Sequence, residues 1–232
     1  MTGDPRMASV LPELLDIDEV LRYMGCPPQQ ADAATRTLAE ECAGLMLREI
    51  RPRWTYRREE LTPESGGVRL GSGLLLAGDD LKRHLQGCHQ ALLFAVTLSA
   101  GADLAIRRAE SRDLARALCL DCCATAAVEQ VCGLIEDRLR EVCPGCCFTT
   151  RFSPGYGDLP LNLQGPLLEL LDAPRRIGLC VNDHHILTPR KSVTAIIGLS
   201  REQPAGMQRD CGDCPLMYGC HYRKAGGHCG LS

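Results

Sequence analysis

The spacing of apolar and polar positions predicts helices in the N-terminal part of the chain. Asp16 offers an N-cap for a short helix that reaches Tyr23 and ends before a glycine and two prolines. A longer helix is expected over about residues 30–50, because four side chains, mostly apolar, recur there at helical spacing. These side chains are Leu38, Cys42, Leu45 and Glu49.

Short apolar or alternating runs predict strands further along the chain. The expected strands cover residues 53–57, 68–70, 74–76, 91–99, 148–152, 177–181 and 192–199. Further helices are expected over residues 79–86, 102–110, 112–142 and 162–171, with Gly101 ending the strand before it. Strands and helices follow one another without a repeated strand–helix–strand unit. We therefore expect an α+β fold with a mainly antiparallel sheet.

The same pattern predicts three parts. Residues 1–15 are expected to be a leader, and residues 16–202 a single main domain. Residues 203–232 begin with a linker and continue as a tail without hydrophobic periodicity. Such a tail cannot bury a core of its own, so it needs a metal or the main domain to hold it.

Composition narrows the function classes. The net charge of -3 and the 4% aromatic content do not favour a nucleic-acid surface. No signal peptide is evident, and the uninterrupted apolar runs are far shorter than the roughly 20 residues of a membrane helix. We therefore expect a cytoplasmic protein without a membrane or nucleic-acid partner. In that compartment the 15 cysteines are core residues, metal ligands or redox groups, and not a disulfide framework.

The segment from Arg151 to Asp158 is the first candidate site. A predicted strand ends there in a Pro-Gly turn, which brings Arg151 and Tyr156 close to each other beside exposed backbone. A guanidinium clamps a carboxylate with two hydrogen bonds, and a tyrosine adds a flat face and a hydroxyl. Together they suit an amino-acid-like ligand that carries a ring. The alternative is a tight turn whose arginine pairs with a structural acid.

Glu129 is the second candidate. It is the only charged residue between Asp121 and Glu136, in a predicted helix of alanines, valines and cysteines. A carboxylate in such surroundings needs a partner. That partner is a ligand ammonium or an arginine such as Arg151; alternatively, Glu129 is a satisfied core acid or lies on an exposed stripe.

The third candidate lies in the tail, where four cysteines occur within 19 residues. Their spacing is C-x2-C-x5-C-x8-C, which suits a tetrahedral zinc site or an iron–sulfur cluster. The predicted ligands are Cys211, Cys214, Cys220 and Cys229. The pairs Cys119/Cys122 and Cys143/Cys146 are expected to be structural, the pair His184-His185 to lie in a solvated turn, and Lys191 to be a surface lysine.

From Arg151 to Ser200 the sequence resembles the activation domain of cobalamin-dependent methionine synthase. The matching pieces are Arg-Phe-Ser-Pro-Gly-Tyr at 151–156, Leu-Glu-Leu-Leu at 168–171, Ile-Gly-Leu at 177–179, Leu-Thr-Pro at 187–189 and Ser-Val-Thr-Ala at 192–195. A weaker similarity extends upstream through residues 94–97 and the helix that carries Glu129 and Arg140.

The resemblance implies a C-shaped α+β fold, with a twisted antiparallel sheet flanked by helices, that binds S-adenosylmethionine in a shallow groove. It implies that Arg151 and Tyr156 contact this ligand and that the backbone at Ser153 lies along the adenosyl part. Gly155 belongs to the same turn, and Glu129 matches an acid near the amino end of the ligand. An aspartate that the family uses to bind the ligand aligns with Gly25, so that contact is either missing or replaced by Asp16 or Asp18.

The catalytic and corrinoid-binding modules of methionine synthase have no counterpart here, and the cysteine-rich tail has none in the full-length enzymes. The resemblance therefore implies a stand-alone accessory subunit that contributes to methionine synthase activity. It would support reductive methylation of cob(II)alamin on a separate corrinoid protein, with electrons from a donor protein or from an iron–sulfur cluster in the tail. The alternatives are a reductive activator of another corrinoid methyltransferase, a non-enzymatic corrinoid-protein binding module, and a zinc-stabilised interaction protein.

Overall fold

The computed structural model describes residues 10–204 of the chain. Contacts between residues divide this part into two compact units. The first unit contains residues up to 57 together with 93–144 and 161–194, and the second contains 58–92, 145–160 and the residues from 195. Three long strands contribute residues to both units: β1 (Arg53–Glu64), β4 (Gln90–Thr97) and β8 (Ser192–Ser200).

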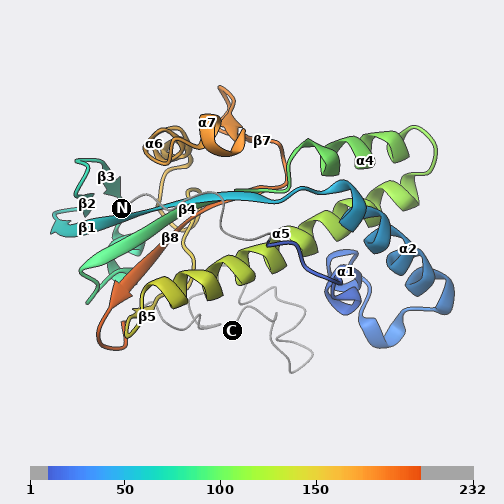
Figure 1. Cartoon of the computed structure of the whole chain (residues 1–232), viewed down its shortest axis with the longest axis horizontal. Coiled ribbons are helices and arrows are strands. Elements are labelled where there is room, and N and C mark those ends of the chain that lie inside the picture. The colour runs from blue at the N-terminus through green and yellow to red at the C-terminus, as the bar shows by residue number, and fades with distance from the viewer. Residues whose placement is uncertain (1–9, 205–232) are drawn as a thin grey trace. The chain divides into compact units, whose positions relative to one another are not determined.

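A six-stranded sheet has the order β3-β2-β1-β4-β8-β5 (Figure 1). Its short strands are β2 (Gly67–Leu70), β3 (Leu75–Ala77) and β5 (Cys147–Phe148). The β1–β2, β2–β3 and β5–β8 pairs are antiparallel, and β6 (Cys180–Val181) pairs antiparallel with β7 (Leu187–Thr188) in a separate ribbon. The predicted α+β class with a twisted antiparallel sheet is confirmed.

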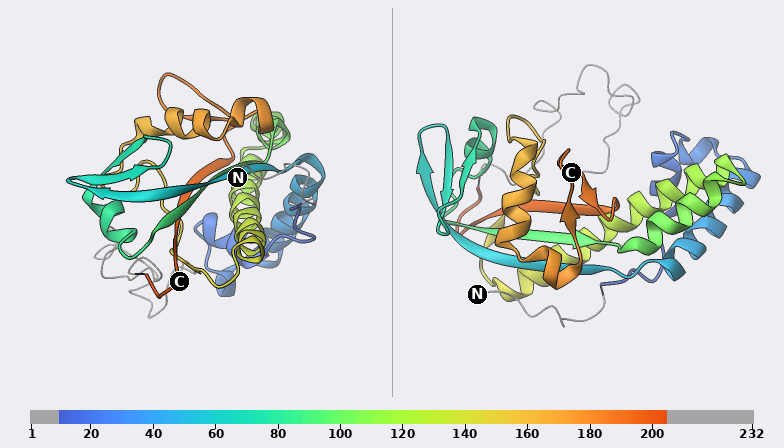
Figure 2. Two further views of the ribbon diagram at one scale, coloured as in Figure 1. Left: turned by 60° about the vertical axis from the view of Figure 1, so that its left-hand side comes forward. Right: turned by 90° about the horizontal axis from the view of Figure 1, so that it is seen from above.

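Helices dominate the first unit. They are α1 (Ile17–Tyr23), α2 (Ala33–Glu49), α4 (Ala100–Glu110), α5 (Leu114–Val142), α6 (Gln164–Leu170) and α7 (Ala173–Ile177), with single 3-10 turns at Pro28–Gln30 and Leu161–Leu163. Helices α1, α2 and α4 pack against α5, and Figure 2 shows α2 and α4 running alongside it. Val10 and Leu15, which precede α1, are also buried.

Helix α5 is the centre of this packing. Its buried residues include the alanines 117, 124, 126 and 127 and the cysteines 119, 122, 123 and 132, whose small side chains allow neighbouring helices to approach closely. By length and hydropathy α5 meets the requirements of a membrane-crossing helix, which a count of uninterrupted apolar runs did not reveal. In its most apolar window 61% of the residues are buried inside the protein, and core helices pass the same test.

Three details differ from the prediction. Gly101 does not end a strand but lies in the first turn of α4, where a Cβ atom would overlap the backbone oxygen of Glu49. Ile177 ends helix α7 and does not begin a strand. On α2 only Cys42 of the predicted face is buried, because the buried stripe passes through Ala39, Cys42, Ala43 and Met46.

The second unit holds the remaining helix, α3 (Asp79–His84). Its strands are joined through His89, whose backbone N–H donates to Leu199 O at 3.2 Å and whose carbonyl accepts from Leu61 N at 2.9 Å. The core of this unit consists of the buried side chains of Val68, Leu70, Leu76, Leu81, Leu85, Leu92, Phe148, Leu159, Ile196, Ile197 and Leu199.

Candidate functional site

The segment that follows β5 forms a compact turn in the second unit. Phe152 anchors it to β8, because the two backbone N–H groups of Phe152 and Ile196 donate to each other's carbonyls at 2.9 and 2.8 Å. Tyr156 N then donates to Ser153 O at 3.0 Å, and Gly155 N donates to Leu159 O at 2.8 Å. Gly155 has φ +92°, a conformation that glycine adopts without the steric cost of a Cβ atom.

Four of the predicted site residues therefore belong to one short segment. Arg151 and Ser153 are half-buried, whereas Gly155 and Tyr156 are exposed. Tyr156 keeps 52% of its surface accessible, although backbone hydrogen bonds from Gly155, Tyr156 and Leu159 order the turn around it. A large aromatic side chain that stays exposed on an ordered turn is available to a ligand.

The sequence places Asp158 at the end of this segment but predicts no role for it. Its carboxylate accepts hydrogen bonds from Asp79 N at 2.7 Å and Asp80 N at 3.1 Å, and Asp80 Oδ2 accepts from Asp158 N at 3.2 Å. These bonds join the turn to the beginning of α3. Asp79 follows Gly78 and Asp158 follows Gly157, and this repeated Gly-Asp pair is the hint that the sequence offers.

The other end of α3 also contacts the segment. His84 Nε2 lies 2.8 Å from the carbonyl oxygen of Thr150, to which it donates. The His84 ring lies 5.1 Å from the ring of Phe152, and Phe152 meets Tyr156 edge to face at 6.2 Å. The rings of His84, Phe152 and Tyr156 therefore contact one another in series, from α3 to the exposed tyrosine.

Glu129 lies on α5 in the first unit, whereas the turn belongs to the second. Its side chain is half-buried, between the buried residues Val128 and Val131. Burial is the main cause that raises the pKa of Tyr23 at the end of α1, and the negative charge of Glu129 raises it further. The guanidinium of Arg22 lies 4.3 Å above the Tyr23 ring. Glu129 is thus close enough to α1 to act on its tyrosine electrostatically.

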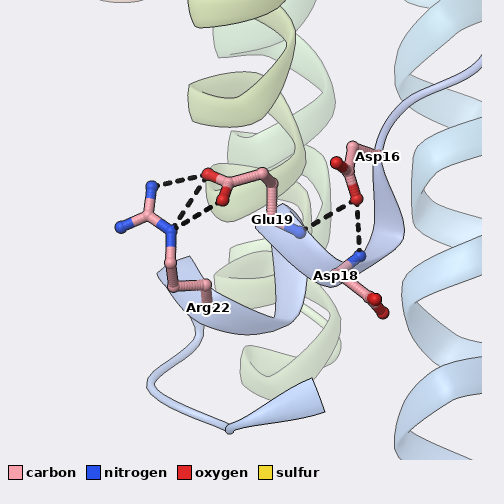
Figure 3. A network of polar contacts seen from close by, with 4 residues as sticks. All are labelled: Asp16, Asp18, Glu19 and Arg22. Carbon is pink, nitrogen blue, oxygen red and sulfur yellow. Dashed lines mark hydrogen bonds and ion pairs between the residues drawn. The ribbon is translucent and has the colours of Figure 1, made fainter. Parts of the chain in front are cut away.

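The two acids proposed to replace the missing aspartate have other roles. Asp16 caps α1, because its Oδ1 accepts from Asp18 N at 3.0 Å and from Glu19 N at 3.2 Å (Figure 3). Asp18 pairs with Arg36 at 3.2 Å. Figure 3 also shows Glu19 holding Arg22 through both carboxylate oxygens, the shortest contact being 2.6 Å. Both predicted substitutes are therefore engaged in holding α1.

The predicted metal ligands Cys211, Cys214, Cys220 and Cys229 lie outside the described residues. Within residues 10–204 no group of three or more His, Cys, Asp or Glu side chains is arranged to hold a metal ion. No disulfide occurs in that range either, and most of its cysteines are buried, as expected for small core residues.

Two further predictions concern residues 184–191. His184 and His185 lie in a turn held by Asn182, whose Oδ1 accepts from His184 N at 3.0 Å, and His184 is exposed as predicted. The prediction that Lys191 is a surface lysine is wrong. Its side chain is only 14% exposed and donates to Asp121 O at 3.1 Å and Thr125 Oγ1 at 2.9 Å, both on α5.

A hollow of about 510 Å³ lies elsewhere in the second unit. It is lined by Leu61, Pro63, Val68, Asp79, Lys82, Arg83, Leu85, Gln86, Gly87 and Cys88. None of the predicted ligand-binding residues lines it. The turn, with its exposed tyrosine and half-buried arginine, remains the stronger candidate because its side chains match a definite ligand chemistry.

Comparison with known proteins supports the fold. No protein-family model matches the chain, and no curated protein matches its sequence. Among solved structures the fold is similar to the crystal structure of the MetH reactivation domain bound to AdoHcy, with a TM-score of 0.64 over 90% of this chain and 79% of that one. The two sequences are 13% identical. The fold predicted from the resemblance is confirmed.

Proposed function

We propose that the chain binds S-adenosylmethionine at the turn from Arg151 to Tyr156 and serves as a reactivation subunit for a corrinoid-carrying methionine synthase. The observation that carries this proposal is the turn itself. It presents an exposed tyrosine and a half-buried arginine on an ordered backbone, in a fold similar to that of an AdoHcy-bound reactivation domain.

The side chains have the chemistry that the ligand requires. The Arg151 guanidinium would clamp the carboxylate of the ligand, and the Tyr156 ring would cover its adenosyl part. The backbone at Ser153 and Gly155 lets the ligand approach closely.

This chain contributes positioning and no acid or base. A reduced corrinoid on the partner would supply the electron pair for methyl transfer from the sulfonium, with AdoHcy as the leaving group. Arg151 would fix the carboxylate of the ligand at the turn, which leaves the methyl group for the docked partner. Such an arrangement requires a partner in trans. A corrinoid-carrying methionine synthase and an electron donor protein are the partners we propose, and the cytoplasm is the location we expect.

Calorimetric titration with S-adenosylmethionine tests the proposal. The wild type should bind one equivalent, and Arg151→Ala should lose about 1.5–3 kcal/mol, which is roughly a ten- to hundredfold weaker affinity. Arg69→Ala is the matched control, because Arg69 also lies in the second unit but pairs with Glu64 on β1. Equal affinities of the wild type and Arg151→Ala would rule out the anchor role. An absence of binding by the wild type would rule out the proposed function.

A second experiment tests the partner. With S-adenosylmethionine, a reductant and a separate corrinoid protein, the chain should accelerate the loss of the cob(II)alamin absorbance. It should not methylate homocysteine by itself. If the chain leaves the rate of cob(II)alamin loss unchanged on methionine synthase but accelerates it on another corrinoid methyltransferase, the second protein is the partner.

We also propose that Cys211, Cys214, Cys220 and Cys229 hold one metal centre, with an iron–sulfur cluster favoured over zinc. The support is their spacing in a tail without apolar periodicity, together with the need for a low-potential electron during reactivation. Anaerobic purification followed by analysis of iron, labile sulfide and zinc tests this assignment. Stoichiometric zinc without sulfide would make the tail a structural or docking element, and a metal-free protein would contradict the proposal.

A further inference from the structure

We propose that Asp158 is a positioning residue for the ligand-binding turn and acts through helix α3. The inference rests on the proposed function, because an effect of Asp158 on ligand affinity requires that the turn binds S-adenosylmethionine. It assigns a role to a residue that does not itself need to touch the ligand.

The first argument is the reciprocal bonding between Asp158 and the start of α3. Both carboxylate oxygens of Asp158 are used, Oδ2 by Asp79 N at 2.7 Å and Oδ1 by Asp80 N at 3.1 Å. In return, Asp80 Oδ2 accepts from Asp158 N at 3.2 Å. The segment is therefore tied to α3 in both directions, by its side chain and by its backbone.

The second argument is that no other side chain among residues 10–204 caps the start of α3. The residue at its N-cap position is Gly78, which makes no side-chain hydrogen bond to the helix. The first N–H groups of a helix need acceptors from outside the helix, and a carboxylate there also interacts favourably with the helix dipole. Asp158 supplies these acceptors from 79 residues further along the chain. Helix α3 and the turn therefore stabilise each other.

The third argument is the clearance between the two segments. A Cβ atom at Gly157 would lie 2.5 Å from Asp80 Oδ2, and one at Gly78 would lie 2.6 Å from Asp158 Oδ1. Both glycines also have positive φ, at +51° and +146°. A side chain at either position would push the carboxylates away from the N–H groups they accept from. Gly78 and Asp79 thus pack closely against Gly157 and Asp158, and we call these two Gly-Asp pairs the clamp.

The clamp lies beside the residues that we assign to the ligand. Asp158 follows Tyr156 by two positions, and Leu159 N donates to Tyr156 O at 3.0 Å. At the far end of α3, His84 holds the carbonyl of Thr150 and contacts the Phe152 ring. Helix α3 therefore contacts the segment both before Ser153 and after Gly155, and these contacts fix the position of Tyr156.

The test compares loss of this cap with loss of an equivalent cap that does not touch the turn. Asp158→Ala removes both acceptor oxygens, and Asp158→Asn keeps one. Asp32→Ala is the matched control, because Asp32 caps α2 in the first unit by accepting from Thr35 N at 2.7 Å. Two readouts are needed: the Kd for S-adenosylmethionine by calorimetry, and backbone amide exchange in the ligand-free protein.

We expect Asp158→Ala to raise the Kd about three- to thirtyfold, the equivalent of a lost N-cap, and Asp158→Asn to raise it less. Asp32→Ala should lower the melting temperature but leave the Kd unchanged. In the ligand-free protein, the amides of Gly155, Tyr156 and Leu159 should exchange faster in Asp158→Ala than in Asp32→Ala.

Unchanged exchange at these three amides in Asp158→Ala would overturn the positioning role, whether or not the wild type binds ligand. Equal effects of Asp158→Ala and Asp32→Ala on the Kd would also overturn it, since a general loss of stability would then explain both. If the wild type fails to bind S-adenosylmethionine while exchange responds as expected, the clamp stands and the proposed function falls.

Discussion

Lys191 Nζ lies 3.0 Å from Asp121 Oδ1, and this pair joins the segment that leads into β8 to helix α5. The lysine is 14% exposed and the aspartate 39%, so the ion pair lies at the edge of the first unit with its cation turned inward. Thr125 Oγ1 and the carbonyl of Asp121 complete the set of acceptors. All three donor positions of the ammonium are therefore satisfied by one turn of α5.

Replacing this lysine should cost stability. Lys191→Met keeps much of the apolar stem but leaves three acceptors without their donor. We expect the free energy of unfolding to fall by about 1–3 kcal/mol. Urea unfolding measures this change. Arg175→Ala is the control, because the Arg175 side chain is 79% exposed and pairs with Asp172 one turn away on the surface. It should change stability by less than about 0.5 kcal/mol, and an equal effect of both variants would contradict the role of Lys191.

The misassignment of Lys191 illustrates what periodicity cannot show. Apolar spacing located α1, α2, α5 and most strands, because burial of one face dictates that spacing. Whether a lysine next to a strand turns inward depends on an acceptor 70 residues earlier in the chain. The helix over residues 173–177 was missed for a similar reason, since five residues around a proline carry too little periodic signal.

In the candidate site, too, the sequence predicts what depends on neighbouring residues and misses what depends on contacts between distant ones. Arg151, Ser153, Gly155 and Tyr156 are neighbours in sequence, so their occurrence in one turn followed from the Pro-Gly pair. The role of Asp158 could not be predicted, because its partners, Asp79 and Asp80, are far away along the chain. The substitutes suggested for the missing aspartate, Asp16 and Asp18, were acceptable by charge alone, but charge does not reveal that one caps a helix and the other pairs with an arginine.

Gly101 provides a second stability prediction. A Cβ atom there would overlap the carbonyl oxygen of Glu49 at the end of α2, and backbone cannot move aside as a flexible side chain can. We expect Gly101→Ala to lower the free energy of unfolding by about 1–3 kcal/mol, the usual cost of overpacking. Circular dichroism during urea titration is a suitable measurement.

Gly133→Ala is the matched control for that variant. Gly133 also lies in a helix, α5, but no atom outside its own turns of the helix backbone comes within 4 Å of the position of its Cβ. Alanine there should raise the free energy of unfolding by about 0.5–1 kcal/mol, because it removes backbone entropy from the unfolded chain. Opposite signs for the two variants are the expected result. A neutral Gly101→Ala would mean that α2 and α4 do not approach as closely as described.

The last prediction concerns three buried thiols between α2 and α5. Cys119 Sγ lies 3.8 Å from Leu38 O, and Cys123 Sγ lies 3.9 Å from Ala39 O. A hydrogen bond with the Cys123 thiol, together with burial, raises the pKa of Cys119 to about 12. The pKa of Cys42 is raised as well, first by its hydrogen bond with Cys119 and then by burial. The thiols of Cys42 and Cys119 therefore stay protonated in the folded protein at neutral pH and are poor nucleophiles.

The sign of the pH dependence follows from the pKa of Cys119. In the unfolded chain a cysteine ionises near about pH 8.5, whereas in the folded protein Cys119 holds its proton up to about 12. Above about pH 8.5 the folded state binds more protons than the unfolded state, so stability must fall as the pH rises. The stabilisation is complete below that pH and is lost as the pH rises through the folded pKa.

Urea unfolding at about pH 7.5 and at about pH 10 measures this loss. The free energy of unfolding should decrease more between these two pH values for the wild type than for Cys119→Ala, which has no thiol to ionise at this position. Equal decreases would show that Cys119 does not titrate differently in the two states.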